Sequence, residues 1–487
     1  MNTEQAVLDA VPKQLYIAGE WRDGANGETV AVEDPAHGET IAEVADAAPG
    51  DALAALGAAH ETFHGDWRSS APRERSDILR AAYEALMDRA DDLALLMTLE
   101  MGKPLAESKA EIAYGASVLR WYAEEAVRLD GRFTTHEAGS GRLLTMKQPV
   151  GPCVFITPWN FPLAMGTRKI GPAIAAGCTM VVKPAKLTPL SMLMLAKILE
   201  EVGLPGGVLN VVTARSSGSV MEPLIRDPRT RKLSFTGSTE VGRKLIEQSA
   251  EQVLRVSMEL GGNAPFVVFE DADVDDAVKG AMVAKMRNIG EACTAANRFH
   301  VAQPVAEEFA RKLAEKMGAL KVGRGTEQGV EVGPLIDEDQ LEKVHDLVQD
   351  AVAKGARVLC GGERVDRPGH FYRPTVLVDV PADARVLKEE VFGPVAPIRA
   401  FGSEEEAIAA ANDTGFGLVA YLYTADLKRA LRVTERIETG MVGLNQGLVS
   451  NAGAPFGGIK HSGIGREGGP EGMAEYLETK YVAIATD

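Results

Sequence analysis

The sequence contains little cysteine, few aromatic residues and a deficit of positive charge. Only four of its 487 residues are cysteine, and 6% are aromatic. Cysteines this sparse and scattered exclude a disulfide framework, and neither they nor the eight dispersed histidines have metal-site spacing, so we expect no bound metal. The net charge of −17 makes nucleic acid and anionic membranes poor partners.

Apolar runs of membrane length are missing as well. One of the longest, Leu190–Leu199, is interrupted by Lys197 and is shorter than a bilayer span. The segment Met1–Asp9 is acidic and has no apolar core, so we expect no signal peptide. Together with the cysteine usage, these absences predict a cytoplasmic protein that binds neither membrane nor nucleic acid.

The chain has the composition of a globular protein with a large core, with 45% hydrophobic and 25% charged residues. Its length favours roughly three structural units. Residues 16–47 show the glycine-punctuated pattern of short strands and turns. Asp51 is predicted to cap an alanine-rich helix. Apolar spacing around Leu79 predicts a longer helix that Gly102 ends, and another helix is predicted over 106–128.

Two segments have the pattern of exposed strands. Residues 131–150 are polar, lack a helical period and favour a projecting hairpin. Residues Tyr476–Ile484 alternate between polar and apolar side chains, and we expect them to form a strand that pairs with the hairpin. Such arms often pair between subunits, which favours a homo-oligomer.

A regular alternation of apolar strands and helices begins at Val150. Its strands are predicted at 153–157, 179–183, 208–213, 232–236 and 256–259. Thr188 and Pro189 are predicted to begin one of the intervening helices. A second alternation starts at Ala264. Its helices are predicted near 273–287, 304–317, 338–355, 404–412 and 427–437. The order predicts an α/β fold with parallel sheets covered on both faces and a domain boundary at Leu260–Asn263.

Cys293 is the one cysteine in a polar loop that contains glycine, Asn288–Arg298. Its neighbours Ala292, Thr294 and Ala295 are small, so another molecule could approach the sulfur. A thiolate is the strongest nucleophile among side chains when a base or a positive field is near. The loop alone still favours a small buried hydrophobe, which is the usual role of a free cysteine.

Two side chains that follow predicted strands could assist such a nucleophile. Glu259 ends a strand just before two glycines, and there it could act as a general base or form a salt bridge. Asn160, in Pro158-Trp-Asn-Phe-Pro, has an amide that could stabilise an oxyanion, or it could only shape a turn between prolines.

Two other positions suit a nucleotide. Gly237 and Ser238 lie in a strand-to-helix turn, where free amides and the helix dipole favour a phosphate, although such turns are also common without a ligand. Lys183 and Lys186 form either a cationic patch at the carboxyl end of a strand or a pair of solvated charges. The string Gly463–Gly468 matches a dinucleotide fingerprint by letter, but no predicted strand precedes it, and we interpret it as a structural loop.

A series of motifs resembles, in order and spacing, those of the aldehyde dehydrogenase superfamily. They are Pro158-Trp-Asn-Phe-Pro, Lys183-Pro-Ala, Phe235-Thr-Gly-Ser, Met258-Glu-Leu-Gly-Gly-Asn, the Cys293 loop, Glu390-Val-Phe-Gly-Pro and Pro455-Phe-Gly-Gly. The resemblance extends from about residue 15 to the C-terminus, and several long motifs in register are far more specific than any one of them.

The resemblance implies a Rossmann-like cofactor domain, a second α/β catalytic domain and a small β oligomerisation arm. The corresponding ranges are 1–130 and 150–260, 261–445, and 131–149 with 470–487. Residues 446–469 are implied to return to the cofactor domain and the rim of the active site. A homodimer or homotetramer is also implied.

In the family, the residue that matches Cys293 attacks the aldehyde carbonyl. The side chain that matches Asn160 and the Cys293 amide hold the resulting oxyanion. Hydride loss to the nicotinamide leaves a thioester, and the residue that matches Glu259 activates water to hydrolyse it. The resemblance thus makes Cys293 catalytic, not structural. Glu478 matches a position that is sometimes placed in a proton relay.

A further set of residues resembles the family's cofactor site, including its pyrophosphate turn and its ribose anchor. These residues are Trp159, Lys183, Ala185, Lys186, Gly237, Ser238, Leu260, Glu390 and Phe392. Many NAD-preferring relatives have glutamate where this chain has Lys186. A glutamate repels a 2′-phosphate and a lysine attracts it, so we predict NADP as the preferred cofactor and NAD as the alternative.

The segments around Arg168 and Arg287 resemble the succinate-semialdehyde dehydrogenase branch. There, positions that match both arginines and Ser450 hold the substrate's distal carboxylate, which the planar guanidinium fork suits. Either arginine could instead pair with a local Asp or Glu. Phe161 and Phe456 are expected to wall the aliphatic part of the substrate.

Several alternatives stay open. Glutarate semialdehyde differs by one methylene, which is worth only about 1–3 kcal/mol of discrimination. An uncharged aldehyde is a second alternative, and a nucleotide-binding protein without catalysis is a remote third. Some relatives carry a second cysteine two positions after the nucleophile. This chain has Ala295 there, so we expect no disulfide switch in the loop.

Overall fold

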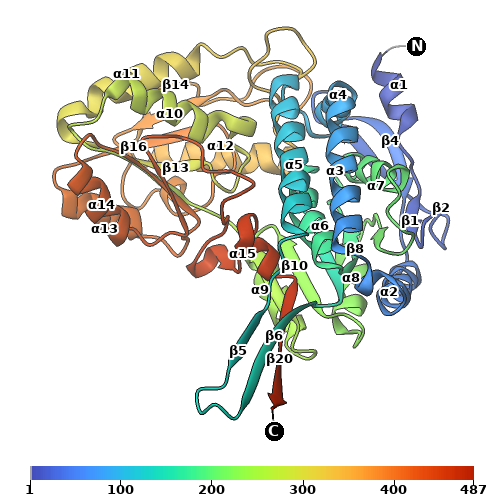
Figure 1. Ribbon diagram of the computed structural model, residues 1–487. Helices are drawn as coiled ribbons and strands as arrows, with labels where there is room; N and C mark the ends of the chain where they lie inside the picture. The colour runs from blue at the N-terminus through green and yellow to red at the C-terminus, as the bar shows by residue number, and fades with distance from the viewer. Residues whose placement is uncertain (1–2, 487) are drawn as a thin grey trace.

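The computed structural model describes residues 3–486 and is built around two large sheets, a three-stranded arm and a two-stranded hairpin (Figure 1). The predicted α/β fold is confirmed. Within residues 3–486, no helix is both long enough and apolar enough to cross a membrane. The same residues contain no group of three or more His, Cys, Asp or Glu side chains that could hold a metal ion.

The first sheet has eight strands in the order β19-β11-β10-β7-β8-β9-β1-β2. The strands from β11 to β9 run parallel, and β19, β1 and β2 are antiparallel edges. Every residue of β8 and β10 is buried, because helices cover both faces. The strands are β1 (Leu15–Ile17), β2 (Glu20–Arg22), β7 (Pro152–Ile156), β8 (Thr179–Lys183), β9 (Leu209–Val211), β10 (Lys232–Thr236), β11 (Arg255–Glu259) and β19 (Gly463–Ile464).

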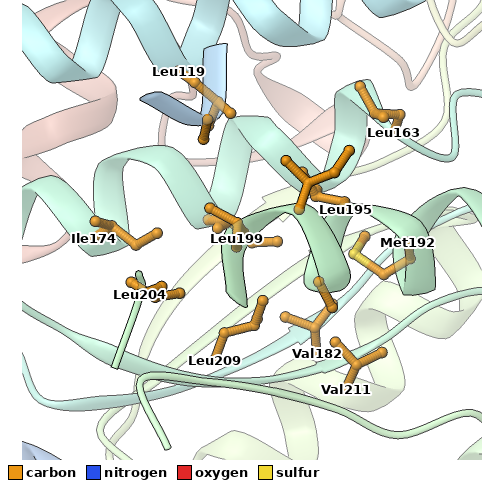
Figure 2. Packing of buried hydrophobic residues seen from close by; sticks show 14 of the residues in the cluster. Leu119, Leu163, Ile174, Val182, Met192, Leu195, Leu199, Leu204, Leu209 and Val211 are labelled. Atoms are coloured by element: carbon orange, nitrogen blue, oxygen red, sulfur yellow. The ribbon is translucent and has the colours of Figure 1, made fainter. Parts of the chain in front are cut away.

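Alternate residues of these strands point into two separate cores. Phe155 and Val182 pack with helices α3 to α7, whereas Val154 and Val181 pack with α2 and α8 on the opposite face. Figure 2 shows side chains of α6 and α7 packed over strands β8 and β9. The helices are α1 (Thr3–Ala10), α2 (Pro49–His64), α3 (Pro72–Asp88), α4 (Ala90–Met101), α5 (Leu105–Glu125), α6 (Ala164–Ala176), α7 (Leu190–Glu201), α8 (Ser217–Arg226) and α9 (Thr239–Ser249).

The second sheet has seven strands in the order β14-β15-β16-β13-β12-β17-β18, all parallel except β14. Helices α10 to α12 pack on one face against Phe266, and α13 and α14 pack on the other against Val267. These elements are β12 (Ala264–Val268), α10 (Val274–Met286), β13 (Ala296–Ala302), α11 (Gln303–Gly318), α12 (Glu338–Ala353), β14 (Arg357–Cys360), β15 (Thr375–Val378), β16 (Val395–Phe401), α13 (Glu404–Asn412), β17 (Val419–Tyr423), α14 (Leu427–Arg436) and β18 (Met441–Leu444).

The arm projects away from both sheets (Figure 1). It consists of β5 (Arg132–Thr135), β6 (Gly141–Pro149) and β20 (Leu477–Ala485), with β6 in the middle. β20 pairs antiparallel with β6, which confirms the predicted pairing of the C-terminal segment with the hairpin. The remaining elements are the hairpin β3 (Thr29–Asp34) and β4 (Glu39–Ala45), the helix α15 (Gly469–Ala474), and the 3-10 turns η1 (Trp67–Ser69), η2 (Arg287–Gly290), η3 (Arg385–Leu387) and η4 (Lys460–Ser462).

The structure corrects two predicted helix boundaries near the N-terminal third. The helix predicted to start at Asp51 begins two residues earlier, and the Asp51 carboxylate accepts a hydrogen bond from the Ala48 amide within the first turn. The long helix predicted to end at Gly102 is two helices. Arg89 interrupts the helical path between α3 and α4, and Gly102 ends only the second.

The predicted start of helix α7 is also corrected. Thr188 does not cap the helix, because its hydroxyl donates to the Trp159 carbonyl at 3.1 Å. The carboxylate of Glu100, from α4, accepts instead from the amides of Leu190 and Ser191, at 2.7 and 2.9 Å. A side chain from another helix thus satisfies free amides at the helix start, which a local pattern does not reveal.

Candidate functional site

The candidate site lies where the carboxyl ends of the first sheet meet the amino ends of the second. Strand β11 ends at Glu259, and β12 begins at Ala264, so a short connection joins the two sheets. A Cβ on Gly262 in this connection would lie 2.2 Å from the Cys293 carbonyl oxygen, so only glycine fits. Parallel sheets bind ligands at their carboxyl ends, which makes this junction the expected place for chemistry.

Cys293 lies at the centre of this junction, on the loop between η2 and β13, and is partly exposed. Burial raises the pKa of its thiol to about 12. The positive charge of Arg168 opposes the shift, and the negative charge of Glu259 adds to it. The residue is partly exposed, and its surroundings favour the neutral thiol over the thiolate. A positive charge beside the sulfur would favour the thiolate, which is the stronger nucleophile.

The backbone before Cys293 is held in an unusual conformation. Asn288 and Ile289 have positive φ values of 55° and 62°, which cost free energy for residues with a Cβ. The Asn288 side-chain amide holds the turn by donating to the carbonyls of Asn160, at 3.1 Å, and Glu291, at 2.8 Å. The loop that carries the nucleophile is therefore preorganised by its own hydrogen bonds.

Asn160 follows β7 and is brought to the same loop. Its Nδ2 donates to the Glu291 carbonyl at 3.0 Å and has a second N–H, which suits an oxyanion held beside Cys293. The buried Lys103 ammonium fixes the Asn160 carbonyl at 2.7 Å and also pairs with Glu111 at 2.6 Å. The predicted pairing of Asn160 with the nucleophile thus has a structural support that the sequence did not indicate.

Glu259 is buried at the end of β11. Its Oε2 has no hydrogen-bond partner among residues 3–486. Burial raises its pKa well above the usual range, and the carboxylate of Glu467 adds to the shift, whereas Arg168 and Lys169 oppose it. An acid with a raised pKa and a free oxygen can accept a proton from water near neutral pH.

Glu467 is a functional candidate that the sequence analysis missed. It is buried and pairs with Lys169 at 2.5 Å and with Arg168 at 2.8 Å. Strand β19 pairs with β11 so that Gly463 lies opposite Glu259, and this pairing brings the segment of Glu467 to the site. The Gly463–Gly468 string contains the residue, but we had interpreted it only as a structural loop.

Glu478, which the resemblance suggested for a proton relay, is wrongly placed for that role. Its side chain is exposed on β20 and pairs with Arg255 at 3.0 Å. The carboxylate that lies close enough to influence Glu259 is Glu467.

The residues expected at a cofactor site converge along the first sheet. Ser238 caps α9 by accepting from the Val241 amide at 3.4 Å, which leaves other amides of the first turn for a phosphate. Lys183 is buried at the end of β8, and burial lowers its pKa to about 8, with nearby Lys186 adding to the shift. Lys186 is exposed and Ala185, between the two lysines, is partly exposed. The two lysines and the start of α9 both lie at the carboxyl ends of strands of the first sheet, where a phosphorylated dinucleotide would fit.

The other cofactor positions lie at the junction of the sheets. The Glu390 carboxylate accepts from the Gly262 amide at 2.9 Å. The rings of Trp159 and Phe392 form an edge contact with centroids 5.3 Å apart. Leu260 is buried and packs over Gly242 of α9, where a Cβ would lie 2.4 Å from its side chain. The structure therefore places these residues near Cys293, on the side of the first sheet.

A pocket of about 530 Å³ lies beside the 3-10 turn η2, which precedes Cys293 in the chain. It contains three of the predicted substrate residues, Phe161, Arg287 and Ser450. The Arg287 guanidinium lies 4.7 Å from the centre of the Phe161 ring and donates to the Ser450 hydroxyl at 3.5 Å. An apolar cluster that includes Phe161 and Ala292 links this pocket to the residues beside Cys293.

The other two predicted substrate residues, Arg168 and Phe456, do not line this pocket. Arg168 is buried, pairs with Glu467 and lies over the Phe456 ring at 3.8 Å. It affects the pKa of both Cys293 and Glu259. The structure therefore brings Arg168 to the reacting groups and not to the pocket that contains Arg287.

Comparison with known proteins agrees with this geometry. The model of the aldehyde dehydrogenase family matches residues 21–482. The chain is 58% identical to the succinate-semialdehyde dehydrogenase of Paenarthrobacter nicotinovorans, over 91% of this chain and 99% of that protein. It is 52% identical to the NADP(+) succinate-semialdehyde dehydrogenase GabD of Escherichia coli K12 (97% and 98% covered) and to a glutarate-semialdehyde dehydrogenase of Pseudomonas putida KT2440 (97% and 98%). A crystal structure of an NADP-dependent enzyme of E. coli superposes with a TM-score of 0.97 at 51% identity, covering 98% of this chain and 99% of that one.

Proposed function

Since the chain belongs to the aldehyde dehydrogenase family, we propose that it oxidises succinate semialdehyde to succinate with NADP as the preferred cofactor. The observation that carries the choice of substrate is Arg287. Its guanidinium lines the pocket, and no carboxylate of residues 3–486 lies within salt-bridge distance of it. Glu107, Glu111 and Glu331 also line this pocket, and Glu111 pairs with Lys103. Arg287 is the cation of the lining and can bind an anionic group, such as the distal carboxylate of a semialdehyde.

The chain's own residues account for the chemistry as follows. The Cys293 thiol gives its proton to Glu259, which passes it to solvent, and the sulfur adds to the aldehyde carbon. The Asn160 amide holds the oxyanion that forms. Collapse of this oxyanion releases a hydride from the carbon and leaves a thioester on Cys293. NADP, when bound, supplies the ring that accepts a hydride. Glu259 then takes a proton from water, and the resulting hydroxide hydrolyses the thioester on Cys293. Glu467 and Arg168 set the charge around Glu259 while this happens.

Replacing Arg287 tests the proposed substrate. Loss of two charge-assisted hydrogen bonds in R287A should raise the KM for succinate semialdehyde about a hundredfold. The KM for an uncharged aldehyde such as butanal should change less than about threefold, because it has no carboxylate to lose. R120A, on the exposed face of α5, is the matched control and should change neither value. An equal effect of R287A on both substrates would contradict the assignment.

Glutarate semialdehyde is the second candidate, because a relative at 52% identity carries that name. A panel of succinate semialdehyde, glutarate semialdehyde and butanal separates the candidates by kcat/KM. If no aldehyde gives even a single-turnover burst of reduced cofactor, the remote alternative of a nucleotide-binding protein without catalysis holds.

The proposed NADP preference rests on Lys183 and Lys186 at the end of β8. K186E should reverse the preference, since a glutamate repels the 2′-phosphate and leaves the free ribose diol of NAD unhindered. We expect the ratio of kcat/KM for NADP over NAD to fall by about a hundredfold, as removal and reversal of one close charge allow. K428E on α14 gives the same net charge far from the site and should leave the ratio unchanged.

We also propose that the arm makes a homodimer or homotetramer. Both its outer strands, β20 and β5, have an unpaired edge, as does β18 of the second sheet. Phe133 and Tyr481 on the arm are 63% and 58% exposed, which is unusual for aromatic side chains without a partner. Replacing residues 132–148 by a short glycine-serine linker should shift the sedimentation coefficient to that of a monomer.

We propose that the domains have the boundaries and roles that the resemblance implied. Residues 1–130 and 150–260 bind the cofactor, 261–445 carry the nucleophile, 131–149 and 470–487 form the arm, and 446–469 return to the site. Four free cysteines and a small-molecule substrate fit a reducing compartment, and we propose the cytoplasm.

A further inference from the structure

Four lysines are less than 2% exposed, and one of them has no counter-charge. Lys103, Lys169 and Lys232 each have a carboxylate within 4 Å. Among residues 3–486, Lys285 has none. Its Nζ donates to the Asn297 side-chain oxygen at 2.9 Å and to the Gly393 carbonyl at 3.2 Å. These two acceptors are neutral, so Lys285 differs from the other buried lysines of the molecule.

A buried ammonium with only neutral acceptors is unfavourable. Burial lowers the pKa of Lys285 to about 7, and the negative charge of Glu390 opposes the shift. A methionine could fill the same space without this cost. The two hydrogen bonds therefore point to a role for Lys285, and that role follows from what they connect.

Lys285 connects the two loops that carry the proposed chemistry. Asn297 lies in β13, just after the nucleophile loop, which we define as residues 288–295. Gly393 lies in the cofactor-ring loop, which we define as residues 390–394. The two loops also touch directly, because a Cβ on Gly290 would lie 2.3 Å from the Gly393 carbonyl oxygen and 3.1 Å from that of Lys285.

The same two loops are also connected through Gly262. Glu390 accepts from the Gly262 amide at 2.9 Å, and Gly262 packs against the Cys293 carbonyl. The loops and these contacts thus form a closed ring around the nucleophile. Lys285 is the side chain that completes the ring on the side of Gly290. Glu390 is therefore connected to the segment of Cys293 by two routes.

We propose that Lys285 is a positioning residue that couples the cofactor-ring loop to the nucleophile loop, so that cofactor binding sets the reactivity of Cys293. The proposal rests on the proposed function, because it assumes that Glu390 and Phe392 contact the cofactor. Lys285 touches neither substrate nor cofactor. It acts by holding Gly393 and Asn297 at a constant separation.

The experiment measures the coupling directly. The rate of Cys293 alkylation by iodoacetamide is determined with and without saturating NADP, and the ratio of the two rates is the coupling factor. In wild type we expect a factor far from one. In K285M it should move toward one by at least about fivefold, and the KM for NADP should rise about tenfold, while the KM for the aldehyde stays within about twofold. K285R, which retains the charge and the donors, should restore most of the coupling.

The control separates coupling from stability. L313A removes a buried side chain of α11 in the same core and lowers stability without touching either loop. It should leave the coupling factor unchanged. If K285M unfolds at the same denaturant concentration as L313A yet retains the wild-type coupling factor and KM for NADP, Lys285 is only structural and the proposal is overturned. A wild-type factor of one overturns it as well.

A second variant keeps the test decisive if K285M does not fold. N297A leaves Lys285 with Gly393 alone and should lose part of the coupling, and a wild-type factor in N297A overturns the proposal. The coupling factor requires no turnover. If the wild-type protein binds NADP and shows coupling but oxidises no aldehyde, the proposed function fails while this inference stands.

Discussion

At the scale of the residue, the central fact is that one buried environment raises the pKa of both Cys293 and Glu259. Burial favours the neutral thiol and the neutral carboxylic acid, and each negative charge would raise the pKa of the other group further. Arg168 lies near both and opposes the shift, but its charge is shared with Glu467. A change in the local charge would therefore shift the pKa of both groups together.

This balance predicts the pH dependence of Cys293 alkylation in the protein without cofactor. A thiol with a pKa near 12 is almost wholly protonated at pH 6 to 9, so its thiolate fraction rises tenfold for each pH unit. The alkylation rate of the peptide that contains Cys293, measured by mass spectrometry, should therefore rise with a slope of one in a logarithmic plot. A plateau below pH 9 would contradict the environment described for the sulfur.

The roles of single residues were predictable from the sequence only in part. Cys293 was predicted from its polar loop, Glu259 from its place at a strand end and Asn160 from its side-chain amide, and the family motifs gave all three their catalytic roles. Which arginine is free for a substrate was not predictable, because it depends on Glu467, a residue about three hundred positions away from Arg168 that reaches it only through folding.

At the scale of the element, a side chain of helix α4 fixes the start of helix α7, which follows the segment with the cofactor lysines. The Glu100 carboxylate holds the first amides of α7, directly after the loop that contains Lys183 and Lys186. Burial raises the pKa of Glu100 to about 7, although the amides it accepts from oppose the shift. The carboxyl group is thus protonated in part at neutral pH.

We predict that Glu100 makes stability depend on pH in a defined direction. Its pKa is higher in the folded protein than in the unfolded chain, so the folded state binds the extra proton. Stability is then lost as pH rises from about 4.5 to about 7, by up to about 3 kcal/mol. E100Q cannot titrate. The difference in urea midpoint between wild type and E100Q should shift in favour of E100Q from pH 5 to pH 8, and a constant difference would exclude this role.

Elements were predictable to the extent that their signals are local. Strands β8 and β10 were predicted at their exact bounds, because the apolar residues of β8 and the alternating pattern of β10, each flanked by turn residues, need no distant information. The break between α3 and α4 was missed, since Arg89 has no helix-breaking chemistry. The role of Thr188 was also missed, because its partner Trp159 lies on another segment.

At the scale of the whole molecule, Arg324 forms ion pairs that connect the segment after helix α11 to helix α1 and strand β3. Arg324, after helix α11, donates to Glu4 of α1 at 3.0 Å and to Asp34 of β3 at 2.9 Å. The Asp34 side chain is only 3% exposed and that of Arg324 is 21% exposed. A network with a buried acid is worth more than an exposed pair.

Removing this arginine should loosen the N-terminal helix. R324Q leaves Asp34 buried without its partner, so we expect a loss of about 2–4 kcal/mol and faster proteolytic cleavage near α1. The measurements are the urea midpoint and a trypsin time course. R357Q breaks an exposed ion pair with Asp379 and serves as the control, with a change below about 0.5 kcal/mol. An equal loss of stability in R324Q and R357Q would contradict a special contribution of the Arg324 network.

The pairing of β19 with β11 affects the order in which the protein can fold during its synthesis. A ribosome makes β11 roughly two hundred residues before it makes β19, and the entire second sheet is translated in between. Until β19 has been synthesised, the edge of β11 beside Glu259 has no neighbouring strand. The burial that raises the pKa of Glu259 is therefore complete only after the last part of the chain has been translated.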